Sequence, residues 1–146
     1  MALYLHRESL MNIDKFKHQH NDILESIDTL RRLSKAGVTE NAADIARAIV
    51  AMSSTIKLHL SAEDRVLYPS LQRSGDEQLT KMSQHYQNEM QTIAADYDAF
   101  SRRWNTASQL VGHDRDFRAD ANNVLRKVYE RMQRENHDFY PRIETA

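Results

Sequence analysis

The sequence of 146 residues contains no cysteine, three glycines and two prolines. The lack of cysteine excludes disulfide bonds, thiolate catalysis and cysteine-ligated zinc or iron–sulfur sites, so any metal must be held by nitrogen and oxygen ligands. The formal net charge of -1 gives no electrostatic reason to expect nucleic acid or an anionic membrane as a partner. With 40% hydrophobic residues, the chain can bury a core as a single domain over residues 1–146.

Long hydrophobic runs are also missing. The first ten residues include His6, Arg7 and Glu8, which interrupt the apolar core that a signal peptide needs. No stretch approaches the roughly 18 apolar residues of a membrane span. We therefore expect a cytoplasmic protein without a membrane partner. Because three glycines leave little material for a phosphate-binding loop and no Ser/His/Asp set is present, an enzyme is the less favoured function class.

The few glycines mark where periodic apolar segments stop. Gly37, Gly75 and Gly112 each follow such a segment, as glycines at helix ends do. Pro69 and Pro141 are expected to close the second and fourth segments, because proline cannot continue a helix interior. The predicted helices cover approximately residues 9–36, 40–71, 76–106 and 114–140. Four amphipathic helices with short links predict an all-α protein, arranged as an antiparallel up-down-up-down four-helix bundle.

Ionisable side chains interrupt the apolar stripe of every predicted helix. These residues are His20 in the first helix, His59 and Glu63 in the second, His85 and Glu89 in the third, and Arg131 and Glu135 in the fourth. The third stripe is predicted to read Leu79, Met82, His85, Glu89, Ile93, Tyr97, Phe100 and Trp104. A lone histidine on an apolar stripe is more often an ordinary core residue than a metal ligand. So many ionisable groups in one layer, however, must neutralise one another, bind cations, or both.

Two segments with similar spacing carry much of this pattern: HLSAEDRVLYP at residues 59–69 and RMQRENHDFYP at residues 131–141. Both keep a glutamate and a Tyr-Pro pair, but arginine stands in the second segment where the first has histidine. Together with HNDIL at residues 20–24 and with His85, they resemble the hemerythrin-like (HHE cation-binding) family over nearly the whole chain. The resemblance implies a hemerythrin-like bundle around a non-haem di-iron centre. Members of that family bind dioxygen reversibly, or are linked to iron–sulfur cluster repair, nitric oxide response or iron and oxygen sensing.

The resemblance also implies a role for each ligand residue. His20 and His59 would be terminal ligands of one metal ion, and Glu63 and Glu135 would be the carboxylates that bridge two ions. The second ion would take His85, with Glu89 as a further ligand in some members, and a histidine at the position that Arg131 occupies here.

Arginine cannot ligate a metal, because its guanidinium stays protonated and offers only hydrogen-bond donors. It does carry a positive charge in a planar fork that fits carboxylates. We hypothesise that Arg131 replaces the second ion by pairing with Glu63, Glu135 or Glu89. The centre would then hold one metal ion or none.

Two function classes stay open at this point. The first is a protein with a non-haem metal site, most simply iron as one or two ions, that binds or senses O2, NO or peroxide in a stress response. The alternative is a regulatory or protein-interaction bundle with one metal or no metal, in which Arg131 pairs with core carboxylates. The partner would be a small diatomic ligand in the first case and a protein in the second, and the chain would be a monomer or a homodimer.

Overall fold

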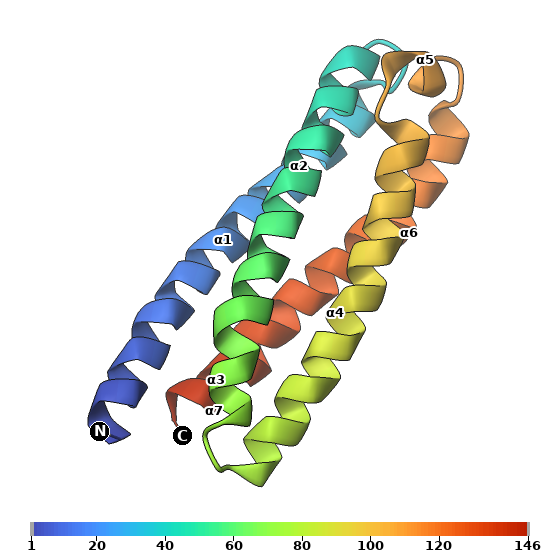
Figure 1. Ribbon diagram of the computed structural model, residues 1–146. Helices are drawn as coiled ribbons and strands as arrows, with labels where there is room; N and C mark the ends of the chain where they lie inside the picture. The colour runs from blue at the N-terminus through green and yellow to red at the C-terminus, as the bar shows by residue number, and fades with distance from the viewer. Residues whose placement is uncertain (1, 146) are drawn as a thin grey trace.

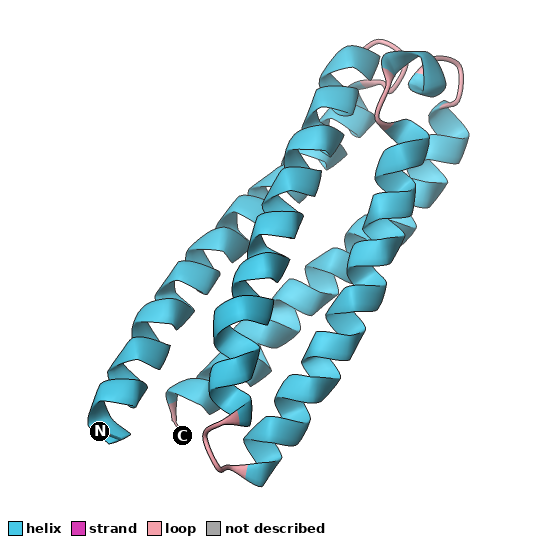
Figure 2. Ribbon diagram, in the orientation of Figure 1, coloured by secondary structure: helices cyan, strands magenta, loops and turns pink. Residues whose placement is uncertain are grey.

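The computed structural model describes the backbone of residues 2–145 and the side chains of residues 13–145. This part of the chain is helical with short links and without strands, so the all-α prediction is confirmed (Figure 2). The elements are α1 (Ala2–Ala36), α2 (Ala42–Ala62), the π-helical turn η1 (Glu63–Leu67), α3 (Tyr68–Gln72), α4 (Glu77–Trp104), α5 (Ala107–Leu110), α6 (Asp114–Arg134), the π-helical turn η2 (Glu135–Phe139) and α7 (Tyr140–Glu144). The short helix α5 lies in the predicted link between residues 106 and 114.

The long helices pack side by side as a helical bundle (Figure 1). Helix α1 contacts α2 and α6, and α4 contacts the same two helices from the other side. Both chain ends lie at one end of the bundle, whereas the link at residues 37–41 and helix α5 lie at the opposite end. None of the described helices has the length and hydropathy that a membrane crossing needs.

The links follow the predicted start and stop signals. Gly37, Gly75 and Gly112 have φ angles of 133°, 81° and 79°, a region that side-chain-bearing residues rarely adopt, so the prediction that glycines mark the helix breaks is confirmed. Asp76 precedes α4, and its carboxylate accepts a hydrogen bond from the backbone N–H of Leu79 at 3.1 Å.

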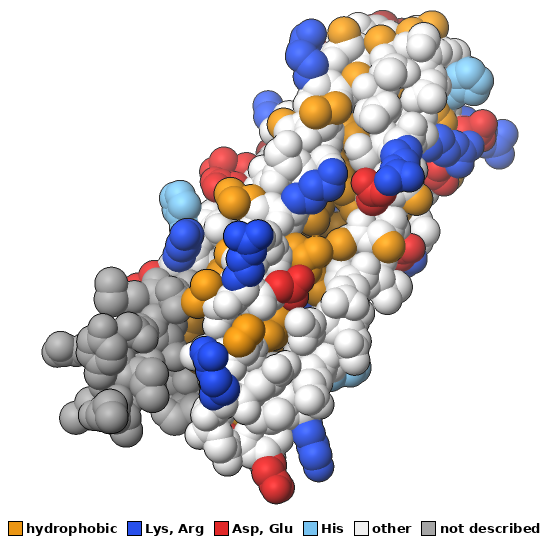
Figure 3. Space-filling view, in the orientation of Figure 1, with side chains coloured by type: hydrophobic (Ala, Val, Ile, Leu, Met, Phe, Trp, Pro, Cys, Tyr) orange, Lys and Arg blue, Asp and Glu red, His pale blue; other side chains and the backbone are white. Residues whose placement is uncertain are grey.

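The interior consists of two apolar clusters with a polar layer between them. The larger cluster includes Ile23, Ile56 and Val128, and the smaller one includes Phe16 and Phe139. In α1, α2 and α6, the buried polar residues lie in sequence between members of the two clusters. On the face seen in Figure 3, positive and negative side chains are interspersed, as expected for a chain of net charge -1.

A buried hydrogen bond inside the larger cluster provides a test of this packing. The Tyr97 hydroxyl donates to the backbone carbonyl of Ile49 at 2.7 Å, and Tyr97 is 2% exposed. The substitution Tyr97→Phe should lower the free energy of unfolding by about 1 kcal/mol, because it removes one buried hydrogen bond and keeps the ring. Urea unfolding of this variant, with Tyr129→Phe on the surface as a control, measures the effect. An unchanged midpoint for Tyr97→Phe would contradict the packing described here.

Candidate metal centre

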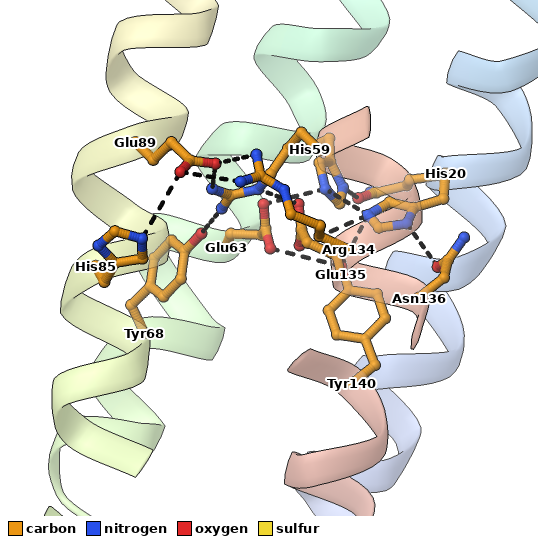
Figure 4. A network of polar contacts seen from close by, with 12 residues as sticks. His20, His59, Glu63, Tyr68, His85, Glu89, Arg134, Glu135, Asn136 and Tyr140 are labelled. Carbon is orange, nitrogen blue, oxygen red and sulfur yellow. Dashed lines mark hydrogen bonds and ion pairs between the residues drawn. The ribbon is translucent and has the colours of Figure 1, made fainter. Parts of the chain in front are cut away.

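The polar layer is formed by five fully buried side chains from three long helices. His20 lies on α1, and His59 lies in the last turn of α2. Glu63 and Glu135 are the first residues of η1 and η2, and Arg131 lies in the last turn of α6. Each of the five is 0% exposed. Figure 4 shows the side chains of His20, His59, Glu63 and Glu135 turned toward one another inside the bundle.

Two π-helical turns follow the two glutamates, and proline explains their position. The backbone N–H of Tyr68 bonds to the carbonyl of Glu63, and that of Tyr140 bonds to the carbonyl of Glu135, which is the i→i−5 pattern of a π turn. Proline lacks an N–H and its ring clashes with the carbonyl four residues back, so a wider turn relieves the clash.

The two prolines do not end their helical segments directly. Pro69 and Pro141 lie in the first turns of α3 and α7, so the second segment ends at Gln72, close to the predicted end at residue 71, and the fourth ends at Glu144, beyond the predicted end at residue 140. One consequence is that Tyr68 and Tyr140, which precede the prolines, are buried against the polar layer.

Two amide side chains fix the orientation of both histidines. The Nδ1 atom of His20 lies 2.8 Å from Asn136 Oδ1, and the Nδ1 atom of His59 lies 2.8 Å from Gln19 Oε1. An amide oxygen can only accept, so each Nδ1 carries the proton and donates it. The two Nε2 atoms therefore present lone pairs, and they lie 3.1 Å apart. Burial, opposed in part by Glu135, lowers the pKa of His59 to about 3, so this ring is neutral at neutral pH.

The two carboxylates turn one oxygen each toward these lone pairs. Glu63 Oε1 lies 3.0 Å from His59 Nε2, and Glu135 Oε2 lies 3.7 Å from His20 Nε2. Neither oxygen has a hydrogen-bond partner among the described residues. The hydroxyl of Tyr140 donates to His20 Nε2 at 2.9 Å and lies 3.5 Å from Glu63 Oε2. Four electron-pair donors thus converge, and a tyrosine hydroxyl is the nearest proton source.

The two carboxylates respond differently to burial. Burial, and then the charge of Glu135, raises the pKa of Glu63 well above its usual range. Burial also works to raise the pKa of Glu135, but contact with His20 and the charge of Arg131 outweigh it and lower this pKa below the usual range. In the metal-free state, any proton held by the pair therefore resides on Glu63.

Arg131 fills the other half of the layer. Its Nε atom donates to Glu135 Oε1 at 2.8 Å, Nη1 to Glu89 Oε1 at 3.3 Å, and Nη2 to the Tyr68 hydroxyl at 3.1 Å. The guanidinium also lies over the ring of Tyr86, 4.5 Å from its centroid. The geometry agrees with the hypothesis that Arg131 pairs with core carboxylates, and it selects Glu135 and Glu89 as the partners.

The third predicted stripe differs from the structure in the first half of α4. The buried residues are Leu79, Ser83, Tyr86, Met90 and Ile93, so Met82, His85 and Glu89 lie beside the buried face and not on it. The predicted stripe advances by three residues from Leu79 to Met82 and by three more to His85. At about 100° per residue, these six residues place His85 about 120° round the helix from Leu79. The stripe returns to the core at Ile93.

His85 and Glu89 consequently lie outside the buried cluster. The His85 side chain is 75% exposed and lies 3.7 Å from Glu89 Oε2. Glu89 is part-exposed and is held by Arg131 and by Arg134. Metal ligation by His85 and Glu89 therefore stays a prediction. The structure does not bring these two side chains together with the four buried donor atoms.

Four residues of the layer had no assigned role in the sequence analysis. Gln19 and Asn136 each stand next to a site residue in sequence, but adjacency alone does not indicate a hydrogen bond to a histidine on the same or another helix. Tyr68 and Tyr140 carry a better signal, because the same Tyr-Pro pair follows both glutamates.

Comparison with known proteins agrees with this geometry. The family model described as the hemerythrin HHE cation binding domain matches residues 11–143. The chain belongs to this family. Neither a search of curated proteins nor a search of solved structures returned a match. Within this hemerythrin-like chain, His20, His59 and Glu135 offer ligand atoms that all lie within 4.8 Å of one another. Imidazole nitrogens and carboxylate oxygens are cation ligands, and the two carboxylate oxygens without a hydrogen-bond partner among the described residues fit a bound cation.

Removal of the guanidinium tests its place in the layer. Arg131→Ala should lower the free energy of unfolding of the metal-free protein by about 3–5 kcal/mol, because it leaves Glu135 buried without its charged partner. The comparison variant is Arg134→Ala, whose side chain is 45% exposed and whose loss should cost less than about 1 kcal/mol. Chemical denaturation of both proteins gives the two values. A loss below about 1 kcal/mol for Arg131→Ala would mean that this guanidinium does not balance a buried charge.

Proposed function

We propose that this protein binds one metal ion, with iron as the first candidate, between His20, His59, Glu63 and Glu135. In this proposal the long helices form the antiparallel up-down-up-down bundle typical of the family, in a single domain. Arg131 takes the place of a second ion.

The convergence of four electron-pair donor atoms carries the proposal. The Nε2 atoms of His20 and His59 and one oxygen each of Glu63 and Glu135 point into one small volume that water does not reach. Two of these atoms, Glu63 Oε1 and Glu135 Oε2, have no hydrogen-bond donor among the described residues, and a cation would satisfy them. Imidazole and carboxylate together suit iron, manganese or zinc, and a set of two histidines with carboxylate is typical of non-haem iron.

Small-molecule binding is the function that such an ion would support. Four protein donors leave one or two positions of a five- or six-coordinate ion free, and the ion, when bound, supplies an electrophilic centre for O2, NO or peroxide. The protein's residues would hold the ion, exclude bulk water and offer the Tyr140 hydroxyl as a hydrogen-bond donor. We propose a binding or sensing role in a stress response in the cytoplasm, without turnover of an organic substrate.

A second candidate function is a metal-free interaction bundle with a protein partner. The ion pairs of Arg131 with Glu135 and Glu89 support it, because they already neutralise part of the layer. The four converging donors speak against it. With Tyr140 on His20 and one added proton shared by Glu63 and His59, Glu135 Oε2 would still have no donor.

Metal content distinguishes the two candidates. Protein produced in iron-rich medium should contain one metal ion per chain by elemental analysis. His59→Leu should reduce the content at least about tenfold, because it removes a ligand from the centre. The matched control His85→Leu changes an exposed histidine and should leave the content at the parent level. Two ions per chain would contradict the single-ion site, and no ion in iron-, manganese- or zinc-rich medium would favour the metal-free candidate.

The amide side chains of Gln19 and Asn136 hydrogen-bond to the histidine rings, so they should affect metal affinity without contacting the ion. Gln19→Leu and Asn136→Leu are each expected to weaken metal binding about 10- to 100-fold, because the imidazole loses the acceptor that fixes its tautomer and orientation. Competition with a chromophoric chelator measures the affinity. Asn88→Leu on the exposed side of α4 is the control. Parent-like affinity in both variants would show that the tautomers are fixed by something else.

A further inference from the structure

The fixed charges around the centre can be counted from the contacts. The two glutamates contribute -2 when they bind a cation, and Arg131 contributes +1 because its guanidinium does not lose its proton. Both histidines are neutral as ligands. The hydroxyls of Tyr68 and Tyr140 are also neutral, because a phenol ordinarily keeps its proton at neutral pH. The buried layer therefore has a total charge of -1 before an ion is added.

The charges at the edge of the layer do not change this total. Glu89 contributes -1, and Arg134, which pairs with its carboxylate, contributes +1. Asp64 and Asp138 act on the layer through space, but Asp138 is exposed and Asp64 is only partly buried, so solvent screens both. The buried groups consequently decide which ion the site accepts.

A divalent ion would bring the layer to +1, and a trivalent ion would bring it to +2. Excess charge in a fully buried site is costly, because the surroundings cannot solvate it. Arg131 also reduces the number of carboxylate oxygens that an ion can use. Its Nε atom occupies Glu135 Oε1 at 2.8 Å, which leaves one oxygen of this carboxylate for the ion.

We propose that Arg131 is a positioning residue that makes the centre selective for divalent over trivalent ions and so keeps bound iron in the ferrous state. This inference rests on the proposed single-ion site. It also narrows the ligand chemistry, because a guanidinium has no second oxidation state. The ferrous and ferric states of a single ion differ by one electron, and reduction of O2 to peroxide needs two. A centre held in the ferrous state therefore favours NO, which would bind without net electron transfer.

Redox-inert ions test this selectivity without any reaction. Zn(II) and Ga(III) report the divalent and trivalent affinities of the parent, of Arg131→Met, which is neutral and of similar length, and of Arg131→Lys, which keeps the charge. Arg131→Met should shift the affinity ratio toward Ga(III) at least about tenfold, and Arg131→Lys should keep the parent ratio. Arg134→Met, which removes a part-exposed charge on the same carboxylate of Glu89, should leave the ratio unchanged. Arg131→Gln serves if the methionine variant does not fold.

The iron-loaded proteins give a second readout. A tenfold shift in the ferric-to-ferrous affinity ratio corresponds to about 59 mV, so the midpoint potential of Arg131→Met should fall by at least this amount. An unchanged Zn(II)/Ga(III) ratio and potential in Arg131→Met would overturn the inference while leaving the single-ion site intact. The inference would also fail if Arg131→Lys behaved like Arg131→Met, because the effect would then come from shape and not charge. Failure of the parent to bind Zn(II) at all would overturn the proposed function itself.

Discussion

Glu63 and Glu135 lie side by side in a bundle interior that water does not reach, and their charge has to be balanced from within. The helices supply part of the balance: Arg131 holds one oxygen of Glu135, and two imidazole nitrogens lie beside the oxygens that have no other partner. The other polar groups of the layer support this arrangement. The amides of Gln19 and Asn136 orient the rings, and the Tyr140 hydroxyl donates a hydrogen bond to His20 Nε2.

The guanidinium and a metal ion are not equivalent solutions to the same electrostatic problem. A metal ion binds and leaves, whereas Arg131 is part of the chain and is present in every folded molecule. The Arg131 half of the layer can therefore be stable without any cofactor, while the histidine half would depend on an exchangeable ion in the proposed single-ion site. Such an asymmetric centre would keep its fold during metal loss better than a centre that relies on two ions.

Much of this arrangement could be predicted from the sequence. The intervals of three and four residues placed His20, His59, Glu63 and Glu135 on inward faces, and the glycines located the links. The prediction failed for His85, because repeated steps of three residues drift away from a period of 3.6, and a stripe that starts and ends in the core need not stay there. His85 and Glu89 thus have the spacing of a ligand pair, although their positions on α4 leave both side chains accessible to solvent.

Other features depend on contacts between helices, which local patterns do not encode. The hydrogen bond of Gln19 to His59 joins α1 to α2, and the bond of Arg131 to Tyr68 joins α6 to the start of α3. The sequence indicated a positive charge near carboxylates, but it left Glu63, Glu89 and Glu135 as equal candidates. Only the packing of the helices selects among them.

The π turns that begin at the two glutamates also change the helical register of the residues that follow them. Each turn holds an additional residue, and one residue corresponds to about 100° of helical rotation. The residues beyond η1 and η2 are thus rotated relative to those before them, and the polar layer lies at this boundary. A one-residue deletion within either turn would rotate the segment that follows, α3 or α7 with its tyrosine, out of register with the centre.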